Sequence, residues 1–232
     1  MSSKKQFSVI FDLDGTLIDT PRGIVETFTE TLRLMGEAIA EPLTIRATIG
    51  LPLERAFGDL LGLSSDAVKV HYAVKQYQDL FKKIVLPKAE SLIFPGVSEG
   101  LAVLKSRGYL LAIATSKIYV SAEALLKASG MWEYFDLIVC ADQVTHPKPH
   151  PEMGNFLMNK FNVLPENTVM VGDTTHDILM AKGGGMHSIA VTYGIHDQET
   201  LQSVAPSYVV KTFDEVLHTI FNLKEKSDIE NI

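Results

Sequence analysis

The segment from residue 7 to residue 20 constrains the fold of this chain more than any other. It reads FSVIFDLDGTLIDT, an apolar run rich in β-branched and aromatic residues that stops at Asp12. Such a run predicts a buried β-strand. Asp12 and Asp14 follow on alternate positions, which project to the same side of an extended backbone. Two carboxylates at the end of a buried strand are costly unless something there needs negative charge, which indicates a functional site. An Asp/Gly turn with solvated acids explains the pattern taken alone equally well.

The composition limits the partners that the chain can bind. Its 232 residues suffice for one large domain or two modest ones, and 46% apolar with 21% charged residues is an ordinary globular balance. The formal net charge of −7 argues against a nucleic acid as the main partner, because a phosphate backbone needs clustered Lys and Arg. A small phosphorylated ligand remains compatible, since a local cation can outweigh the overall charge.

The single cysteine and the first apolar run indicate a compartment. Cys140 excludes an intrachain disulfide and suits a reducing cytoplasm. It follows a strand-like apolar run, so we interpret it as a buried structural thiol and not as a nucleophile. The first apolar run has only five residues, which fits neither a signal peptide nor a membrane span. We therefore expect a cytoplasmic protein with no membrane partner.

Residues 20–87 show helical periodicity and no convincing strand. Apolar residues recur at helical spacing over 21–36, over 53–62 and over 64–81, which predicts three helices. The stretch 44–52 is too rich in loop-forming residues to assign. We interpret this region as a small all-helical domain inserted after the first strand.

The rest of the chain alternates between strands and helices. This alternation implies right-handed βαβ units and hence an α/β fold, a Rossmann-like parallel sheet with helices on both faces. We expect residues 1–19 and 88–232 to form this core and 20–87 the inserted domain. The predicted strands are 110–115, 137–140, 168–171, 188–191 and 208–210, and the predicted helices are 98–106, 120–129, 151–161, 177–183 and 213–223.

Polar residues follow four of the predicted strands at the point where each strand ends. Ligands of parallel sheets bind beyond the carboxyl ends of the strands, so these residues should meet in one cleft. Besides the acids after the first strand, they are Ser116 and Lys117 after the second, Lys148 in a Lys-Pro-x-Pro-Glu segment after the third, and Asp173 and Asp177 in GDTTHD after the fourth.

These four segments resemble, in order, the four motifs of the haloacid dehalogenase (HAD) superfamily. The motifs are an Asp-x-Asp pair, a Ser or Thr after a hydrophobic strand, a Lys before a helix, and Gly-Asp-x-x-x-Asp. The resemblance implies Asp12 as nucleophile and Asp14 as general acid/base. Lys148 would supply a positive charge, and Ser116 a neutral donor for a phosphoryl oxygen. The resemblance also implies a strand order of 5-4-1-2-3 and makes residues 20–87 a cap of the C1 type.

The charges in such a cleft require a cation. The acids of the first and fourth motifs bring together up to four negative charges, which raise one another's pKa values if unrelieved. Mg²⁺ fits an all-oxygen ligand set that keeps several waters. The resemblance implies that Asp12, Asp173 and the backbone carbonyl of Asp14 hold the metal. Asp177 is expected to orient Lys148 or a metal-bound water.

The resulting expectation is a Mg²⁺-dependent phosphatase of small phosphorylated metabolites, similar to phosphoglycolate phosphatase. Asp12 would attack phosphorus to form an aspartyl-phosphate, and Asp14 would protonate the leaving oxygen and then activate the hydrolytic water. A nucleotidase or an inorganic pyrophosphatase of the same superfamily is the alternative. A dehalogenase is disfavoured because it lacks an acid at the position of Asp14, and a phosphomutase because it carries His where this chain has Ile24.

A phospho-receiver-type binding switch is the candidate from another class, since it also uses an acceptor Asp, a Ser or Thr, and a Lys. Receivers are much shorter and have no cap. They also place the acceptor on an internal strand, whereas Asp12 follows the first strand. The sequence leaves both a monomer and a homodimer open.

Arg46 and three histidines are further candidates near the predicted cleft. Arg46 lies in the irregular stretch 44–52, where its guanidinium could bind a carboxylate or a second phosphate on the leaving group. The alternative is a solvated Arg. His146, His150 and His176 lack a helical His-x-x-x-His geometry, so we interpret them as solvated or substrate-edge residues and not as transition-metal ligands.

Overall fold

A parallel sheet forms the centre of the fold in the computed structural model, which describes residues 6–229. The strand order is β3-β2-β1-β4-β5-β6, and all neighbouring strands in this part of the chain are parallel. The implied order 5-4-1-2-3 is confirmed, and β6 extends the sheet beyond β5. The strands are β1 (Ser8–Phe11), β2 (Leu110–Thr115), β3 (Leu137–Cys140), β4 (Thr168–Gly172), β5 (His187–Val191) and β6 (Tyr208–Val210).

The pairing of β1 on both sides determines where the site lies. Phe11, the last residue of β1, lies opposite Ile113 of β2 and Val171 of β4. The N–H of Asp12 still donates to the carbonyl oxygen of Val171 at 2.9 Å, and the chain then leaves the sheet. The carboxyl ends of these three strands lie side by side, so the residues that follow them share one edge.

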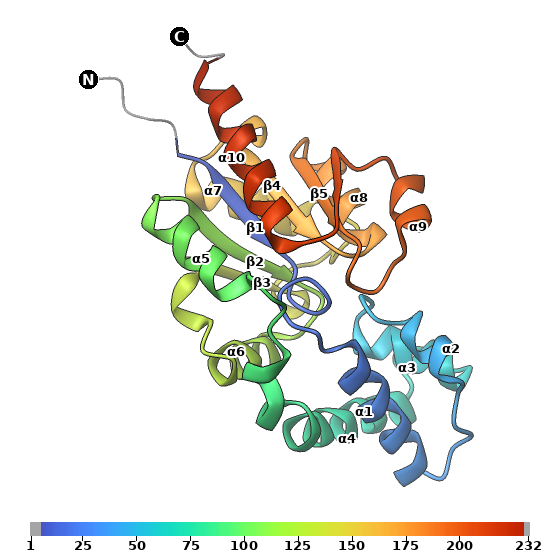
Figure 1. The fold of residues 1–232 in the computed structure, drawn as a ribbon. Coiled ribbons are helices and arrows are strands. Elements are labelled where there is room, and N and C mark those ends of the chain that lie inside the picture. Colours follow the sequence, from blue (N-terminus) through green and yellow to red (C-terminus); the bar gives the residue numbers. More distant parts are fainter. Residues whose placement is uncertain (1–5, 230–232) are drawn as a thin grey trace.

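Helices cover both faces of the sheet (Figure 1). Alternate residues of β1 divide between the faces: Val9 and Phe11 pack with α5 and α10, whereas Ile10 packs with α7 and α8. Burial on both sides explains why the strands read as continuous apolar runs. The core helices are α5 (Val97–Ser106), α6 (Tyr119–Ala128), α7 (Glu152–Phe161), α8 (Thr175–Gly183), α9 (Gln198–Ser203) and α10 (Phe213–Ile229).

The helices between β1 and α5 lie beyond the carboxyl edge of the sheet, apart from those that cover its faces (Figure 1). Aromatic rings pack between them: the ring centroid of Phe28 lies 4.6 Å from that of Phe57 and 4.7 Å from that of Tyr77. The three predicted helices are present, and the unassigned stretch contributes part of the short α2. We call this group the cap; its exact boundaries stay a prediction. Its helices are α1 (Pro21–Leu34), α2 (Pro42–Arg46), α3 (Leu53–Leu61) and α4 (Val68–Ile84), followed by the 3-10 helix η1 (Leu86–Leu92).

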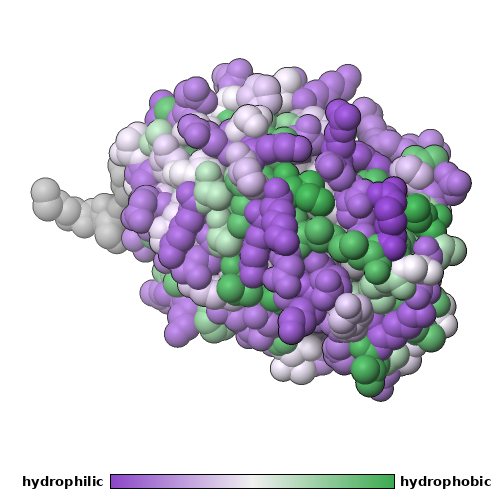
Figure 2. All heavy atoms as spheres, turned by 90° about the horizontal axis from the view of Figure 1, so that it is seen from below, coloured by the Kyte–Doolittle hydropathy of each residue, from purple (hydrophilic) through white to green (hydrophobic). Residues whose placement is uncertain are grey.

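The surface carries apolar side chains among hydrophilic ones. On the face seen from below, hydrophobic side chains form an irregular band that hydrophilic ones interrupt (Figure 2). Among residues 6–229, no helix combines the length and the apolar character needed to cross a membrane. Apolar side chains exposed singly, such as Leu43 and Val68, are normal on protein surfaces.

Leu32→Ala should lower the free energy of unfolding by about 2–5 kcal/mol, because it opens a cavity in the packed cap. Leu32 is 1% exposed, whereas Leu34 on the same helix is 65% exposed. Leu34→Ala is therefore the matched control, with an expected change within about 0.5 kcal/mol. Urea denaturation followed by circular dichroism measures both. Equal effects of the two substitutions would contradict the packing described for α1.

Candidate active site

Asp12 lies directly past the end of β1 and is 5% exposed. Lys148 Nζ lies 2.9 Å from Asp12 Oδ1 and 2.6 Å from Asp177 Oδ1, so one ammonium group connects the first and fourth motifs. Burial raises the pKa of Asp12 to about 7, although Lys148 opposes this shift. Burial lowers the pKa of Lys148, but the charges of Asp12 and Asp177 outweigh it and hold that pKa above its ordinary value. Lys148 is therefore a lasting cation beside Asp12.

Asp173, directly after β4, is fully buried. Its Oδ1 accepts a hydrogen bond from Thr16 Oγ1 at 2.7 Å, and its Oδ2 accepts one from the N–H of Ile195 at 2.8 Å. Burial and the neighbouring charges of Asp12 and Asp177 nevertheless raise the pKa of Asp173 well above its usual value. The motif predicted Asp173, but its two donors lie far away in the sequence and were not predicted.

Glycines allow these carboxylates to pack closely. A Cβ on Gly15 would lie 2.2 Å from Asp173 Oδ2, and one on Gly194 would lie 2.3 Å from the same atom. A Cβ on Gly172 would lie 2.3 Å from the Cβ of Asp177. Any side chain at these positions would displace an acid. Gly15 and Gly172 belong to the predicted motifs, whereas nothing in the sequence marks Gly194.

Protein donors occupy both oxygens of Asp177. Lys148 binds Oδ1, and Oδ2 accepts hydrogen bonds from the N–H of Thr174 at 3.0 Å and from its Oγ1 at 2.7 Å. The bond from the Thr174 N–H is one half of a capping box at the start of α8; in the other half the Thr174 side chain accepts from the N–H of Asp177. The role of Asp177 in orienting Lys148 stays a prediction, and this geometry supports it.

Three acids of the site form a group that suits a metal ion. Asp12, Asp173 and Asp177 each offer a carboxylate oxygen, and these oxygens lie within 4.8 Å of one another. The ammonium group of Lys148 pairs with Asp12 and Asp177, so it balances only part of the negative charge of the three carboxylates. Hard cations such as Mg²⁺ take oxygen ligands of this kind. The residues therefore fit the predicted metal.

Asp14 is held by one neighbour from the start of the cap and one from the second motif. Thr20 Oγ1 donates to Asp14 Oδ1, and Lys117 Nζ lies 3.1 Å from Asp14 Oδ2. The same Nζ lies 4.3 Å from the ring centroid of Phe81 on α4, a cation–π contact. Sequence reasoning placed Lys117 at the correct edge but gave it no role; the available signal was its position directly after Ser116. Lys117 thus links the candidate acid/base to the cap.

Ser116 and Arg46, both predicted to bind substrate, form hydrogen bonds between cap and core. Ser116 Oγ donates to the carbonyl oxygen of Gly50 at 2.7 Å, and Arg46 Nη2 donates to that of Gly194 at 3.0 Å. These two bonds join the cap to the carboxyl edge of the sheet. Their predicted substrate-binding roles are not tested by this arrangement and stay predictions.

A cavity of about 60 Å³ lies between the closed cap and the core. The two acids of the first motif, Asp12 and Asp14, line this cavity together with Ser116. Arg46 does not line it. The cavity therefore joins the candidate nucleophile and the candidate acid/base in one space. The lining from the core is Asp12, Asp14, Thr115, Ser116, Lys117, Ile118 and Ser121, and the lining from the cap is Ile24, Phe28, Thr48, Ile49, Gly50, Leu51, Leu53, Ala56, Tyr77, Gln78 and Phe81.

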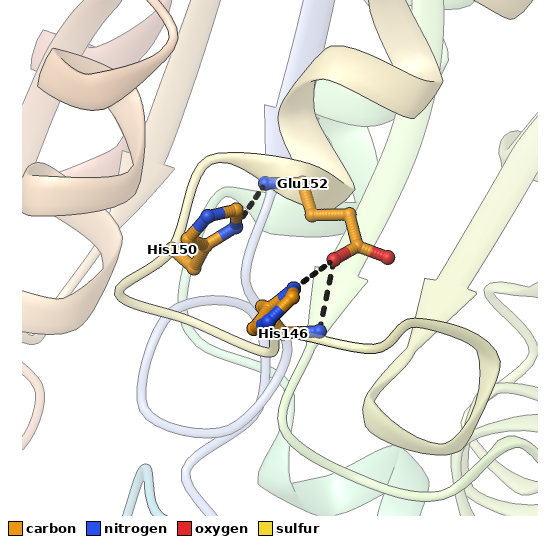
Figure 3. A group of neighbouring side chains, drawn as sticks. All are labelled: His146, His150 and Glu152. Carbon is orange, nitrogen blue, oxygen red and sulfur yellow. Dashed lines mark hydrogen bonds and ion pairs between the residues drawn. The ribbon is translucent and has the colours of Figure 1, made fainter.

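His146 and His150 lie together with Glu152 at the start of α7 (Figure 3). Glu152 Oε2 accepts a hydrogen bond from the N–H of His146 at 2.9 Å, and His150 Nδ1 accepts one from the N–H of Glu152 at 3.3 Å. Both histidines are exposed, and neither lines the cavity. These bonds close the loop before α7, which accounts for the cluster without an ion. His176 is more enclosed, and burial lowers its pKa.

The family model described as haloacid dehalogenase-like hydrolase matches residues 9–191, and the chain belongs to this family. A solved structure of a haloacid dehalogenase-like hydrolase from Bacteroides fragilis is similar, with a TM-score of 0.82 and 27% identity. The similarity covers 91% of this chain and 100% of that one.

Curated relatives narrow the class of hydrolase. A Dickeya dadantii protein named "Probable phosphatase IndB" is 56% identical over 90% of this chain and 91% of its own length. A pyrophosphatase PpaX from Halalkalibacterium halodurans is 34% identical over 92% and 96% of the two chains. A phosphoglycolate phosphatase from Colwellia psychrerythraea is 31% identical over 94% and 98%. The protein is thus a phosphatase of the HAD family.

Asp173→Asn should raise the free energy of unfolding of the metal-free protein. Asn keeps an acceptor for the N–H of Ile195 and removes a buried charge. The pKa of Asp173 is raised in the folded state, whereas an Asp in the unfolded chain has a pKa of about 3.9. Above that pH, the ionised Asp173 therefore lowers the free energy of unfolding. The advantage of Asn should therefore be absent near pH 4 and grow towards pH 8. Urea denaturation in EDTA measures it.

Saturating Mg²⁺ should reverse this order, since a ligand that binds only the folded wild type stabilises it. Asp173→Ala is a poorer probe, because it leaves the N–H of Ile195 unpaired at a cost of about 1–3 kcal/mol. An Asp173→Asn protein that is less stable than wild type in EDTA at pH 8 would contradict the prediction.

Proposed function

We propose that this phosphatase depends on Mg²⁺ and hydrolyses small phosphorylated metabolites through an aspartyl-phosphate intermediate. One observation carries the proposal: Asp12 and Asp14 line the same cavity between cap and core, and Lys148 Nζ lies 2.9 Å from Oδ1 of Asp12. Among residues 6–229, Asp12 Oδ2 has no hydrogen-bond partner. That oxygen is therefore available to attack a phosphorus atom.

The first step transfers the phosphoryl group to Asp12. Oδ2 of Asp12 attacks phosphorus, the bond from phosphorus to the leaving oxygen breaks, and the aspartyl-phosphate forms. Asp14, positioned by Thr20 and Lys117, donates its proton to the leaving oxygen. Lys148 remains beside Asp12 and offsets part of the negative charge that the phosphoryl group brings.

The second step returns the enzyme to its starting state. The Asp14 carboxylate takes a proton from a water molecule, whose oxygen attacks phosphorus. The bond between phosphorus and Asp12 then breaks and phosphate leaves. The closed cap limits access of bulk water. Mg²⁺, held by Asp12, Asp173 and the backbone carbonyl of Asp14, would supply positive charge for the phosphoryl oxygens.

A pyrophosphatase is the second candidate, favoured by the 34% identity to a relative with that name. A phosphomutase has less support, because Ile24 lines the cavity at the position where mutases carry His and has no proton to transfer. The phosphatase relatives also favour an enzyme over a receiver-type switch. We further propose a cytoplasmic location, supported by the free and buried thiol of Cys140.

Asp12→Asn should abolish phosphatase activity while the protein stays folded, because an amide cannot serve as the nucleophile. Phosphate release from p-nitrophenyl phosphate with Mg²⁺ measures the activity, and circular dichroism measures the fold. Asp79→Asn, the same change at an exposed position of α4, is the control and should keep full activity. Substantial turnover by the Asp12 variant, with deamidation excluded by mass spectrometry, would contradict the covalent mechanism.

Arg46→Ala should lower kcat/KM by about tenfold or more on every substrate. Arg46 donates a hydrogen bond to the carbonyl oxygen of Gly194 and so joins the cap to the core. A hydrogen bond from a charged donor contributes about 1.5–3 kcal/mol, and its loss should disfavour the arrangement in which the cap covers the site. Arg55→Ala, at an exposed cap position, is the control. Losses confined to substrates with a second anion would instead support the predicted contact between Arg46 and the leaving group.

A further inference from the structure

The two walls of the active-site cavity differ in chemistry. The core wall carries the charged groups, Asp12, Asp14 and Lys117. The cap wall is mostly aliphatic and aromatic. Its apolar members are Ile24, Phe28, Ile49, Leu51, Leu53, Ala56 and Phe81. Because the phosphoryl group must meet Asp12 at the core wall, the leaving group extends towards the cap wall.

No cation from the cap reaches this cavity in the described part of the chain. The lining residues of the cap include no Lys, Arg or His, and Arg46 is bound to Gly194 outside the lining. The cation of the core wall, Lys117, is already paired with Asp14 and packed on the ring of Phe81. A second anion on the leaving group would be desolvated there without a free partner, which is strongly unfavourable.

Two neutral polar groups on α4 interrupt the apolar wall. Tyr77 and Gln78 both line the cavity, and neither side chain has a hydrogen-bond partner among residues 6–229. Tyr77 is 4% exposed, and burial together with the charge of Asp14 raises its pKa well above 10, so its hydroxyl stays neutral. These groups suit neutral donors or acceptors on a bound molecule.

We infer that the substrate is a phosphomonoester whose leaving group is uncharged and largely apolar, with neutral hydrogen-bonding groups for Tyr77 and Gln78. This inference rests on the proposed phosphatase function and concerns which substrate class the same site accepts. It separates this chain from relatives named for phosphoglycolate and pyrophosphate, whose leaving groups carry a second anion.

Benzyl phosphate and 2-phosphoglycolate provide a matched pair of substrates. Both are esters of a primary alcohol, but one carries a phenyl ring where the other carries a carboxylate. With the full chain and Mg²⁺, kcat/KM for benzyl phosphate should exceed that for 2-phosphoglycolate by at least about tenfold. Pyrophosphate should be hydrolysed as poorly as 2-phosphoglycolate.

A matched pair of variants tests whether the cap wall causes this preference. Gln78→Lys places an ammonium group on the cap wall and should lower the ratio of the two kcat/KM values by about tenfold or more. Gln76→Lys makes the same chemical change on the same helix, at a residue that does not line the cavity, and should keep the wild-type ratio. Thermal unfolding shows that both variants fold.

The outcomes separate this inference from the proposal beneath it. Faster hydrolysis of 2-phosphoglycolate or pyrophosphate than of benzyl phosphate would overturn the inference and leave the phosphatase function standing. Equal shifts of the ratio in the Gln76 and Gln78 variants would also overturn it, since the cap wall would then not be the cause. No phosphate release from any substrate, including p-nitrophenyl phosphate, would overturn the proposed function and the inference together.

Discussion

The site depends on an electrostatic constraint, because three buried carboxylates lie close together and the ammonium group of Lys148 pairs with two of them, Asp12 and Asp177. Burying several carboxylates is unfavourable unless each of them has hydrogen-bond donors or cations as neighbours. Thr16 and the N–H of Ile195 supply donors to Asp173, and Thr174 supplies them to Asp177. The remaining negative charge suits a bound cation. The carboxyl edge of the sheet thus suits the metal and the phosphoryl group of the proposed function.

The cap adds a second physical environment to this charged edge. The core contributes the acids and the lysines, whereas the cap contributes an apolar wall packed around Phe28, Tyr77 and Phe81. Lys117 contacts both parts, since its ammonium lies beside Asp14 and over the ring of Phe81. In the proposed function, the core therefore provides the chemistry common to the family. In the inference drawn from the cavity wall, the cap selects among substrates.

Local patterns were sufficient to predict most of the fold. The predicted strands 110–115 and 137–140 have the observed bounds, because burial on both faces produces an uninterrupted apolar run. The short α2 was not predicted, since five residues hold too little periodicity to separate a helix from a loop. Gly194 was also missed, because its requirement arises from a contact with Asp173 and not from the conformation of its own segment.

By itself, the sequence determined that acids, a lysine and hydroxyl groups follow consecutive strands, because strand periodicity is local and parallel strands share one carboxyl edge. Only the tertiary structure decided what these groups face. It placed Arg46 on Gly194, Ser116 on Gly50, and Tyr77 in the cavity wall. These neighbours belong to separately packed parts of the chain, and no local pattern encodes how the surfaces of two such parts meet.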